Sequence, residues 1–357
     1  MTLSRGTLLG SAGLILAALS GAGSYAVAAP AAQTVAIDAD DIGGVVRNPS
    51  GQPEAGVWVI AETRELPVRF IKIVVTDDQG RYVIPDLPKA NYQVWVRGYG
   101  LVDSDKTASA PGKIVNLASK PAPDDKAAAQ YYPAIYWYSM MKVPGKELFG
   151  GKDPNIPARL TQQGYINSIK SNGCVGCHQL GQLATRTIPA LFHDQATHAD
   201  MWLRRIQSGQ GGMPMIQVGA GDLGGAAFKY LGDWSQRVEK GEYPKNKPQR
   251  PQGLERNIVV TLRDWMNDKQ YLHDLIASDR RNPTVNANGP LFGAPEYSSN
   301  EMPILDPVKN TATTFHMPVR DKDTPYALGP GHVAGDHALL PCAYWGEEMI
   351  WDTRVNN

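Results

Sequence analysis

The sequence predicts a multidomain protein in which an all-β sandwich is followed by an all-α domain and then by a second β-rich region. Residues 41–118 alternate apolar and polar side chains between turns, residues 155–243 show helical spacing, and residues 253–357 return to hairpin-like patterns. At 357 residues the chain is too long for one ordinary domain, so two or three domains are expected.

The composition is that of a globular protein with balanced charge. Hydrophobic residues make up 42% of the chain, and 35 basic residues balance 35 acidic ones. A net charge of zero offers no electrostatic footprint for nucleic acid and no polybasic membrane anchor. We therefore expect no nucleic-acid partner.

Residues 1–29 have the pattern of a secretory signal peptide. Arg5 precedes a stretch of small and apolar residues, and Ala26-Val27-Ala28 offers a cleavage site. A membrane anchor is the alternative, because the apolar stretch is near the lower length limit for crossing a bilayer. That stretch is rich in Gly and Ala and lacks flanking stop-transfer charges. The pattern favours cleavage and export, which would leave no integral membrane span in the mature chain.

The segment 41–118 predicts a small antiparallel β-sandwich, because short apolar-alternating runs are separated by turns such as S-G-Q-P and D-D-Q-G. The neighbouring acids Asp77 and Asp78 are better explained as turn-forming carboxylates than as an acid/base pair. The segment resembles the carboxypeptidase regulatory-like domain, which implies a transthyretin-like sandwich without catalytic residues. The matching positions are Gly44, Gly51, Gly56, Thr76, Asp77, Gly80, Tyr82, Leu87, Pro88 and Tyr92.

The segment 119–154 begins as a polar, proline-containing linker and becomes strongly aromatic. A flexible tether would not carry so many aromatic side chains in so short a stretch. We expect this aromatic linker to pack against a neighbouring domain, with a ligand-stacking platform as the alternative. The aromatic residues are Tyr131, Tyr132, Tyr136, Trp137 and Tyr138.

Residues 174–178 read CVGCH, the attachment signature of c-type haem. Cys174 and Cys177 would bind the porphyrin covalently, and His178 would be the proximal iron ligand. A disulfide between these cysteines would close a very small loop and add little stability. A redox dithiol would follow a strand in a βαβ unit, and a zinc site would need ligands beyond the remote Cys342. The motif therefore predicts one covalent haem c.

The residues around this motif predict a small helical domain over 155–243. Apolar residues at helical spacing precede the motif, an amphipathic helix begins at His198, and a closing helix follows a glycine-rich loop. This order of elements is typical of class I cytochromes c.

The region 253–357 contains hairpins like those of β-propeller blades. Closure of a propeller needs roughly four blades, and this segment has room for about two. We therefore expect either the front part of a longer protein or some smaller β structure. The histidines His316, His332 and His337 have no catalytic partner that the sequence identifies.

The order of these segments resembles a family of bacterial periplasmic proteins described as carboxypeptidase regulatory-like or virginiamycin B lyase-like cytochromes. The matching stretches include YYPAIYWYSMMKVPGK, GCVGCHQLG, GDWSQRVEKGEYP and NPTVNANGP. The resemblance implies a periplasmic electron-transfer protein with periplasmic redox partner proteins. The alternative is the N-terminal part of a haem-coupled dehydrogenase or lyase whose active site lies in the propeller.

The sixth iron ligand has several candidates. Met213 and Met215 follow His178 at a distance suited to a distal loop, and a thioether there raises the reduction potential. The dipeptide Met-Pro favours Met213, whereas the register of the family resemblance favours Met215, which we prefer. His193 and His198 are the alternatives. Nearby, Arg204 and Arg205 either pair with haem propionates or are solvated.

Overall fold

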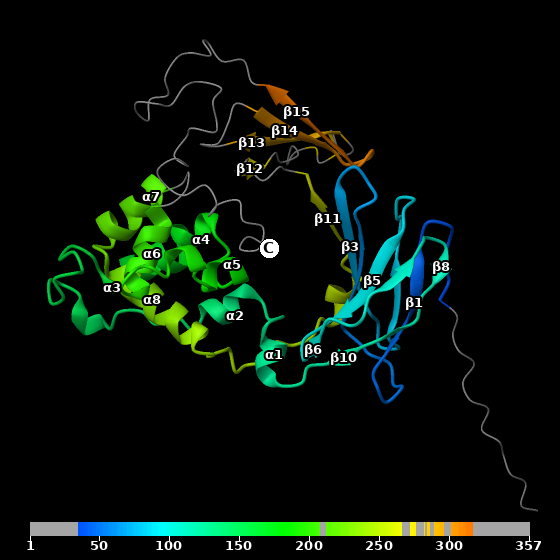
Figure 1. Ribbon diagram of the computed structural model, residues 1–357, viewed down its shortest axis with the longest axis horizontal. Coiled ribbons are helices and arrows are strands. Elements are labelled where there is room, and N and C mark those ends of the chain that lie inside the picture. Colours follow the sequence, from blue (N-terminus) through cyan, green and yellow to red (C-terminus); the bar gives the residue numbers. More distant parts are fainter. Residues whose placement is uncertain are drawn as a thin grey trace, which may run out of the picture. The chain divides into compact units, whose positions relative to one another are not determined.

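The computed structural model describes residues 35–207, 212–265, 272–275, 282, 284–285, 289–295 and 301–316 (Figure 1). The predicted signal peptide, Cys342, His332 and His337 lie outside the described residues. The described chain is mixed: several antiparallel sheets come first, a helical part follows, and further strands come last.

Two β-sheets form the N-terminal part. In the first, β1 (Ile42–Arg47) pairs antiparallel with β4 (Arg81–Ile84) and parallel with β8 (Lys113–Ile114) and β9 (Leu117–Ala118). The second has the order β11-β3-β2-β5-β7. Its strands are β2 (Trp58–Thr63), β3 (Arg69–Val75), β5 (Tyr92–Arg97), β7 (Thr107–Ser109) and β11 (Val260–Asp264). The short strands β6 (Leu101–Val102) and β10 (Lys120–Pro121) pair separately.

Both sheets contribute to one hydrophobic core, as the alternating sequence predicts. Strand β3 buries every second residue, namely Phe70, Lys72 and Val74, because successive side chains of a strand point to opposite faces. The buried Lys72 donates through Nζ to the carbonyl oxygens of Pro85 and Asp86, at 2.6 and 3.1 Å. The aliphatic part of Lys72 is therefore buried on the apolar face of β3, while its ammonium group binds main-chain oxygens.

The helical part follows without a break. Its helices are α1 (Asp125–Ala129), α2 (Ala134–Tyr138), α3 (Gln162–Asn167), α4 (Cys174–Cys177), α5 (Leu183–Arg186), α6 (His198–Gln207), α7 (Gly212–Ile216) and α8 (Ala226–Glu239). Shorter turns are η1 (Lys146–Leu148), η3 (Ala190–Phe192) and η5 (Gly253–Asn257), and the segments η2 (Ser168–Asn172) and η4 (Gln217–Asp222) are π-helical.

The aromatic segment packs into the helical part. Tyr138 of α2 is 2% exposed and lies edge-on to Trp234 of α8, with 5.8 Å between ring centroids. The Trp234 indole donates to the main-chain oxygen of Trp137 at 2.9 Å. Trp202 of α6 stacks on Trp234, with 6.5 Å between ring centroids. The segment that the sequence treats as an aromatic linker is therefore part of the helical core.

The region 253–357 departs from the expected propeller start in one respect. Strand β11 does not join a blade but pairs antiparallel with β3 over five residue pairs, from Val260↔Ile73 to Asp264↔Arg69. An edge strand has unpaired main-chain N–H and C=O groups, and a distant segment of the chain can form hydrogen bonds with them. The expectation that β11 belongs to a propeller-like region was wrong.

The remaining described strands form a four-stranded antiparallel sheet. They are β12 (Leu272–Leu275), β13 (Leu291–Pro295), β14 (Glu301–Asp306) and β15 (Thr311–His316), in that order. Asn310, with φ 52° in the turn before β15, donates to the Val68 carbonyl at 2.8 Å and accepts from Arg263 at 2.9 Å. The described residues contain neither a closed barrel nor a propeller.

Candidate functional site

The CVGCH motif occupies a single helical turn. Helix α4 (Cys174–Cys177) follows the π-helical segment η2, and π-helical turns are frequent at functional sites. Gly173 joins the two, and a Cβ at this position would lie 2.3 Å from the Ser168 carbonyl oxygen. The amide of His178 donates to the Cys174 carbonyl at 2.9 Å, so the turn brings the histidine backbone beside the first cysteine.

The surroundings of His178 disfavour the protonated imidazole. Burial lowers the pKa of His178 below its usual value, and the nearby Arg205 guanidinium lowers this pKa further. Neutral imidazole is the form that binds a metal. Among the described residues none forms a hydrogen bond with the His178 ring.

Two arginines near this turn are partly or wholly buried and donate to main-chain oxygens. The half-buried Arg205 donates through its guanidinium to the carbonyl oxygens of Thr187, at 2.8 Å, and of Ala184. Arg186 is 6% exposed, and its guanidinium donates to the Gly181 carbonyl oxygen at 2.9 Å. Burial lowers the pKa of each guanidinium to about 10.

No carboxylate of the described residues forms an ion pair with either arginine. A desolvated cation without an anion is costly, so this region suits an anionic group. Of the two expectations for Arg205, a fully solvated surface residue does not describe it, because Arg205 is partly buried and donates to main-chain oxygens.

The donor set fits a covalent haem. Cys174 is partly buried against the core that contains Tyr138, Tyr165 and Ile169, while a Cβ on Gly176 would meet no atom within 4 Å. One side of the turn is thus packed and the other has open space at Gly176. The Cys177 side chain lies outside what the structure describes. The Cys174 thiol suits a thioether bond to the porphyrin. The His178 imidazole suits the iron, and a guanidinium without a described carboxylate partner suits the haem carboxylates.

The two candidate methionines lie in a helical turn and not in the expected loop. Helix α7 (Gly212–Ile216) contains both, and residues two apart on a helix do not share a face. The helix would therefore allow only one of them to serve as a ligand at a given site. Met215 is partly buried, and the Met213 side chain lies outside the described atoms.

The two alternative histidine ligands have protein contacts of their own. His198, the first residue of α6 as expected, has its Nε2 2.5 Å from a carboxylate oxygen of Glu239. His193 is exposed, and its Nε2 lies 3.1 Å from the Ile188 carbonyl oxygen. Each of these two histidines therefore has its Nε2 close to an oxygen of the chain.

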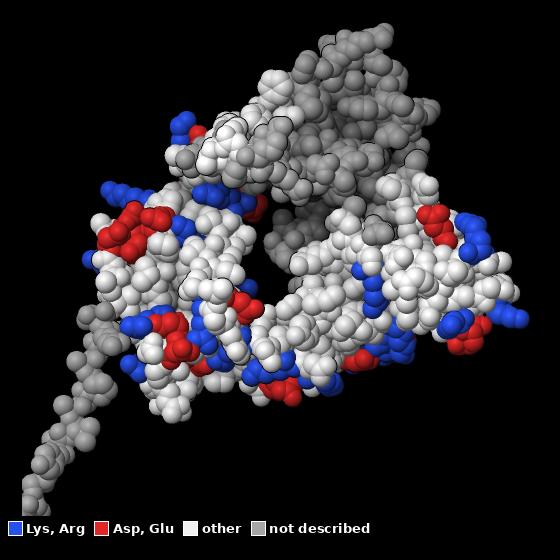
Figure 2. All heavy atoms as spheres, turned by 180° about the vertical axis from the view of Figure 1, so that it is seen from behind, with Lys and Arg blue, Asp and Glu red and all other residues white. Residues whose placement is uncertain are grey.

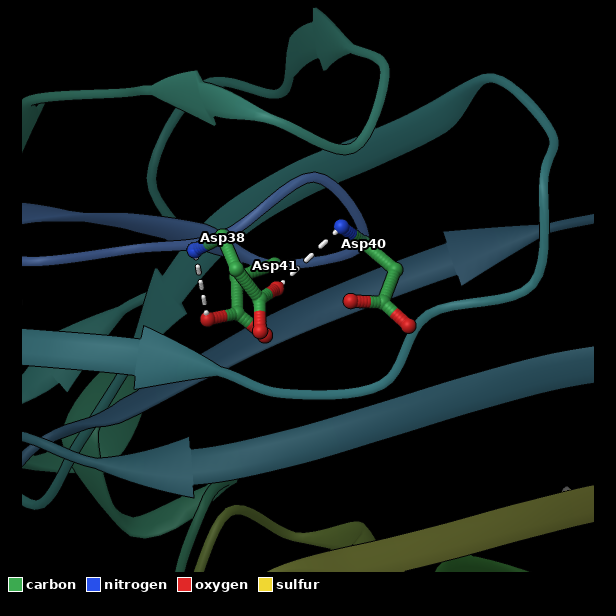
Figure 3. Close-up of side chains that lie close together, drawn as sticks. All are labelled: Asp38, Asp40 and Asp41. Atoms are coloured by element: carbon green, nitrogen blue, oxygen red, sulfur yellow. Dashed lines mark hydrogen bonds between the residues drawn. The ribbon is translucent and has the colours of Figure 1, made fainter.

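An acidic cluster lies just before strand β1 of the N-terminal sheets, away from these residues in sequence (Figure 3). Asp38, Asp40 and Asp41 bring carboxylate oxygens within 4.8 Å of one another. The Asp41 carboxylate accepts from the amide of Asp38 at 3.1 Å, and the Asp38 carboxylate accepts from the amide of Asp40 at 3.3 Å. Exposed carboxylates that bond their own loop are explained as turn-forming groups.

The described surface carries both signs of charge. On the face shown in Figure 2, basic and acidic side chains alternate across the described part. Among the residues that the structure describes, no helix is long and apolar enough to cross a membrane.

No protein-family model matches the chain, and no curated protein matches it. The site is therefore defined by the residues of this chain alone. Sequence reasoning missed Arg186, because an isolated arginine in a polar stretch carries no signal that it will be buried.

Proposed function

We propose that the chain is a periplasmic c-type cytochrome that carries one covalent haem for single-electron transfer. The proposal rests chiefly on one observation, the CVGCH motif, whose two cysteines lie in one helical turn directly before His178. Cys174 and Cys177 would hold the haem, and His178 would be its proximal ligand. When bound, the haem iron supplies one-electron redox chemistry.

The chain's own residues would bind, orient and enclose the cofactor. The Arg205 guanidinium would face its carboxylates, since it has main-chain partners but no ion pair with a described carboxylate. The aromatic core behind Cys174, formed by Tyr138 and Trp234, would exclude water from one side. A dry environment favours the reduced form, which carries less net charge at the iron.

The family resemblance extends the proposal to the other segments. The two-sheet part would be a transthyretin-like, carboxypeptidase regulatory-like sandwich, the helical part a class I cytochrome c domain, and the sheet β12–β15 one blade-like unit of a propeller. The export signal and the family both support a periplasmic location. In this proposal the β parts position periplasmic redox partner proteins.

The experiment is expression in a periplasm with haem-maturation machinery, followed by haem staining of the denatured protein. We expect a stained band at the mass of the processed chain. The Cys174→Ala/Cys177→Ala variant should lose the stain, and the matched control Cys342→Ala should keep it. An unstained wild-type band would contradict the proposal. Haem reduction by an added organic substrate, without a partner protein, would favour the dehydrogenase alternative.

The same material assigns the distal ligand. We expect the oxidised protein to show the weak near-infrared sulfur-to-iron band of His/Met ligation. Met215→Ala should remove this band and lower the reduction potential, and Met213→Ala should leave both nearly unchanged. The reverse pattern would make Met213 the ligand. Retention of the band in both variants would reject both methionines.

A further inference from the structure

Tyr165 carries a buried hydroxyl group without a partner. This tyrosine of α3 is 0% exposed, and its hydroxyl forms no hydrogen bond within the described part of the chain. The neighbouring phenol of Tyr138 differs, because its hydroxyl donates to the Ile169 carbonyl at 2.7 Å. Buried polar groups in native proteins nearly always have a partner, so an isolated buried donor needs an explanation.

The surroundings of Tyr165 restrict what that partner can be. Its ring packs edge-on against Phe149 and Tyr230, with centroids 6.2 and 6.3 Å away. Cys174 packs against the same cluster. The pKa of Tyr165 is raised by burial first and then by its interactions with Tyr230 and Cys174. Cys174, the first cysteine of the CVGCH turn, therefore belongs to the same packed core as this phenol and is near enough to affect its pKa.

Attachment of haem would change what the Cys174 sulfur can do. A thiol can both donate and accept a hydrogen bond, whereas a thioether sulfur can only accept one. A buried donor without an acceptor is suited to an acceptor-only sulfur, and a phenol can rotate its hydroxyl to meet it.

We propose that the Tyr165 hydroxyl donates a hydrogen bond to the Cys174 sulfur in the haem-attached protein, and thereby raises the reduction potential. Tyr165 is then a positioning and tuning residue for the site. This inference rests on the proposed function. It predicts a residue role that the CVGCH motif does not contain, in a helix upstream of it.

The first test compares three haem-loaded variants that each remove one hydroxyl, Tyr165→Phe, Tyr138→Phe and Tyr230→Phe. We expect Tyr165→Phe to retain the wild-type haem content and lower the potential. Tyr230→Phe, which alters the same ring cluster at a partly exposed site, should leave the potential unchanged. Tyr138→Phe should lower stability through the orphaned Ile169 carbonyl. An unchanged potential in Tyr165→Phe would overturn the proposal.

A second measurement does not depend on the potential. The carbon–sulfur stretching band of the thioether in the Raman spectrum should shift when wild-type protein is transferred to D2O, and Tyr165→Phe should abolish that shift. No isotope shift in the wild type would reject the hydrogen bond and leave a buried water as the partner of Tyr165. Haem-free wild-type protein would instead reject the proposed function itself.

Discussion

At the scale of single residues, Tyr82 shows how one side chain joins two segments of the N-terminal β-sheet part that are far apart in sequence. It lies on β4, is 3% exposed, and its hydroxyl donates to the Val115 carbonyl at 2.6 Å. Burial raises the pKa of Tyr82, so the folded protein keeps this phenol protonated at pH values where the unfolded chain loses the proton. The hydroxyl therefore contributes to stability in a pH-dependent way.

We expect Tyr82→Phe to lower the free energy of unfolding by about 1–2 kcal/mol at neutral pH, because the Val115 carbonyl loses its donor. The folded pKa lies above the unfolded value of about 10, so this stabilisation is complete below pH 10 and is lost as pH rises further. The difference between wild type and variant in urea unfolding should shrink above pH 10. The control Tyr243→Phe removes a partly exposed hydroxyl and should change little. A constant difference at all pH values would contradict the linkage.

At the scale of elements, the loop after α4 packs closely against α2. Gly181 has φ 101°, in the left-handed region, and a Cβ here would lie 2.0 Å from the Ala134 carbonyl oxygen. In helix α5, which follows this loop, Arg186 lies over the Trp137 ring at 4.1 Å and donates to Gln130 Oε1 at 3.1 Å. The aromatic segment and the loop therefore form one packed unit.

Gly181→Ala should destabilise the protein by about 3 kcal/mol or more, since it combines backbone strain with a main-chain clash that no rotamer relieves. Thermal or denaturant unfolding measures the loss. Gly51→Ala is the matched control, because Gly51 also has a positive φ of 79° but no atom within 4 Å of the place that an alanine methyl group would take. The control should cost only about 1 kcal/mol. Equal losses in both variants would show that the contact with α2 is not important.

At the scale of the whole molecule, an aromatic cluster links the N-terminal β-sheet part to the helical part. Tyr132 is 7% exposed. Its ring centroid lies 6.0 Å from that of Tyr99, which follows β5, and 6.1 Å from that of Tyr136 of α2. Val238 of α8 packs against the same cluster. Side chains from both parts of the chain are buried together, so their unfolding is expected to be coupled.

Tyr132→Ala should lower stability by about 3 kcal/mol and separate the unfolding of the two parts. Calorimetry of the wild type should show one transition, whereas the variant should show two. Ile135→Ala, at a neighbouring position that is 63% exposed, should retain the single transition with a change of about 0.5 kcal/mol or less. Two transitions already present in the wild type would refute the coupling.

The candidate site was predictable where its residues are contiguous in sequence. Cys174, Cys177 and His178 form a motif whose spacing is set by one helical turn, and the α6 helix begins at His198 as the apolar spacing indicates. The burial of Arg186 and the isolated hydroxyl of Tyr165 were not predictable, since burial depends on segments far away in the chain. A helical turn replaced the expected methionine loop because the glycines there do not prevent helix formation.

Local features of this protein could be read from the order of its residues: the alternation of its strands, the CVGCH motif and the aromatic character of residues 131–138. Each of these follows from neighbours within a few positions, which is the range over which periodicity and turn geometry act. Three features depend on tertiary packing: β11 completes the sheet beside β3, the aromatic segment belongs to the helical core, and Arg186 is buried without an ion pair to any described carboxylate. Strand pairing and burial join residues separated by long stretches of chain, and such contacts are selected by the packing of the whole molecule.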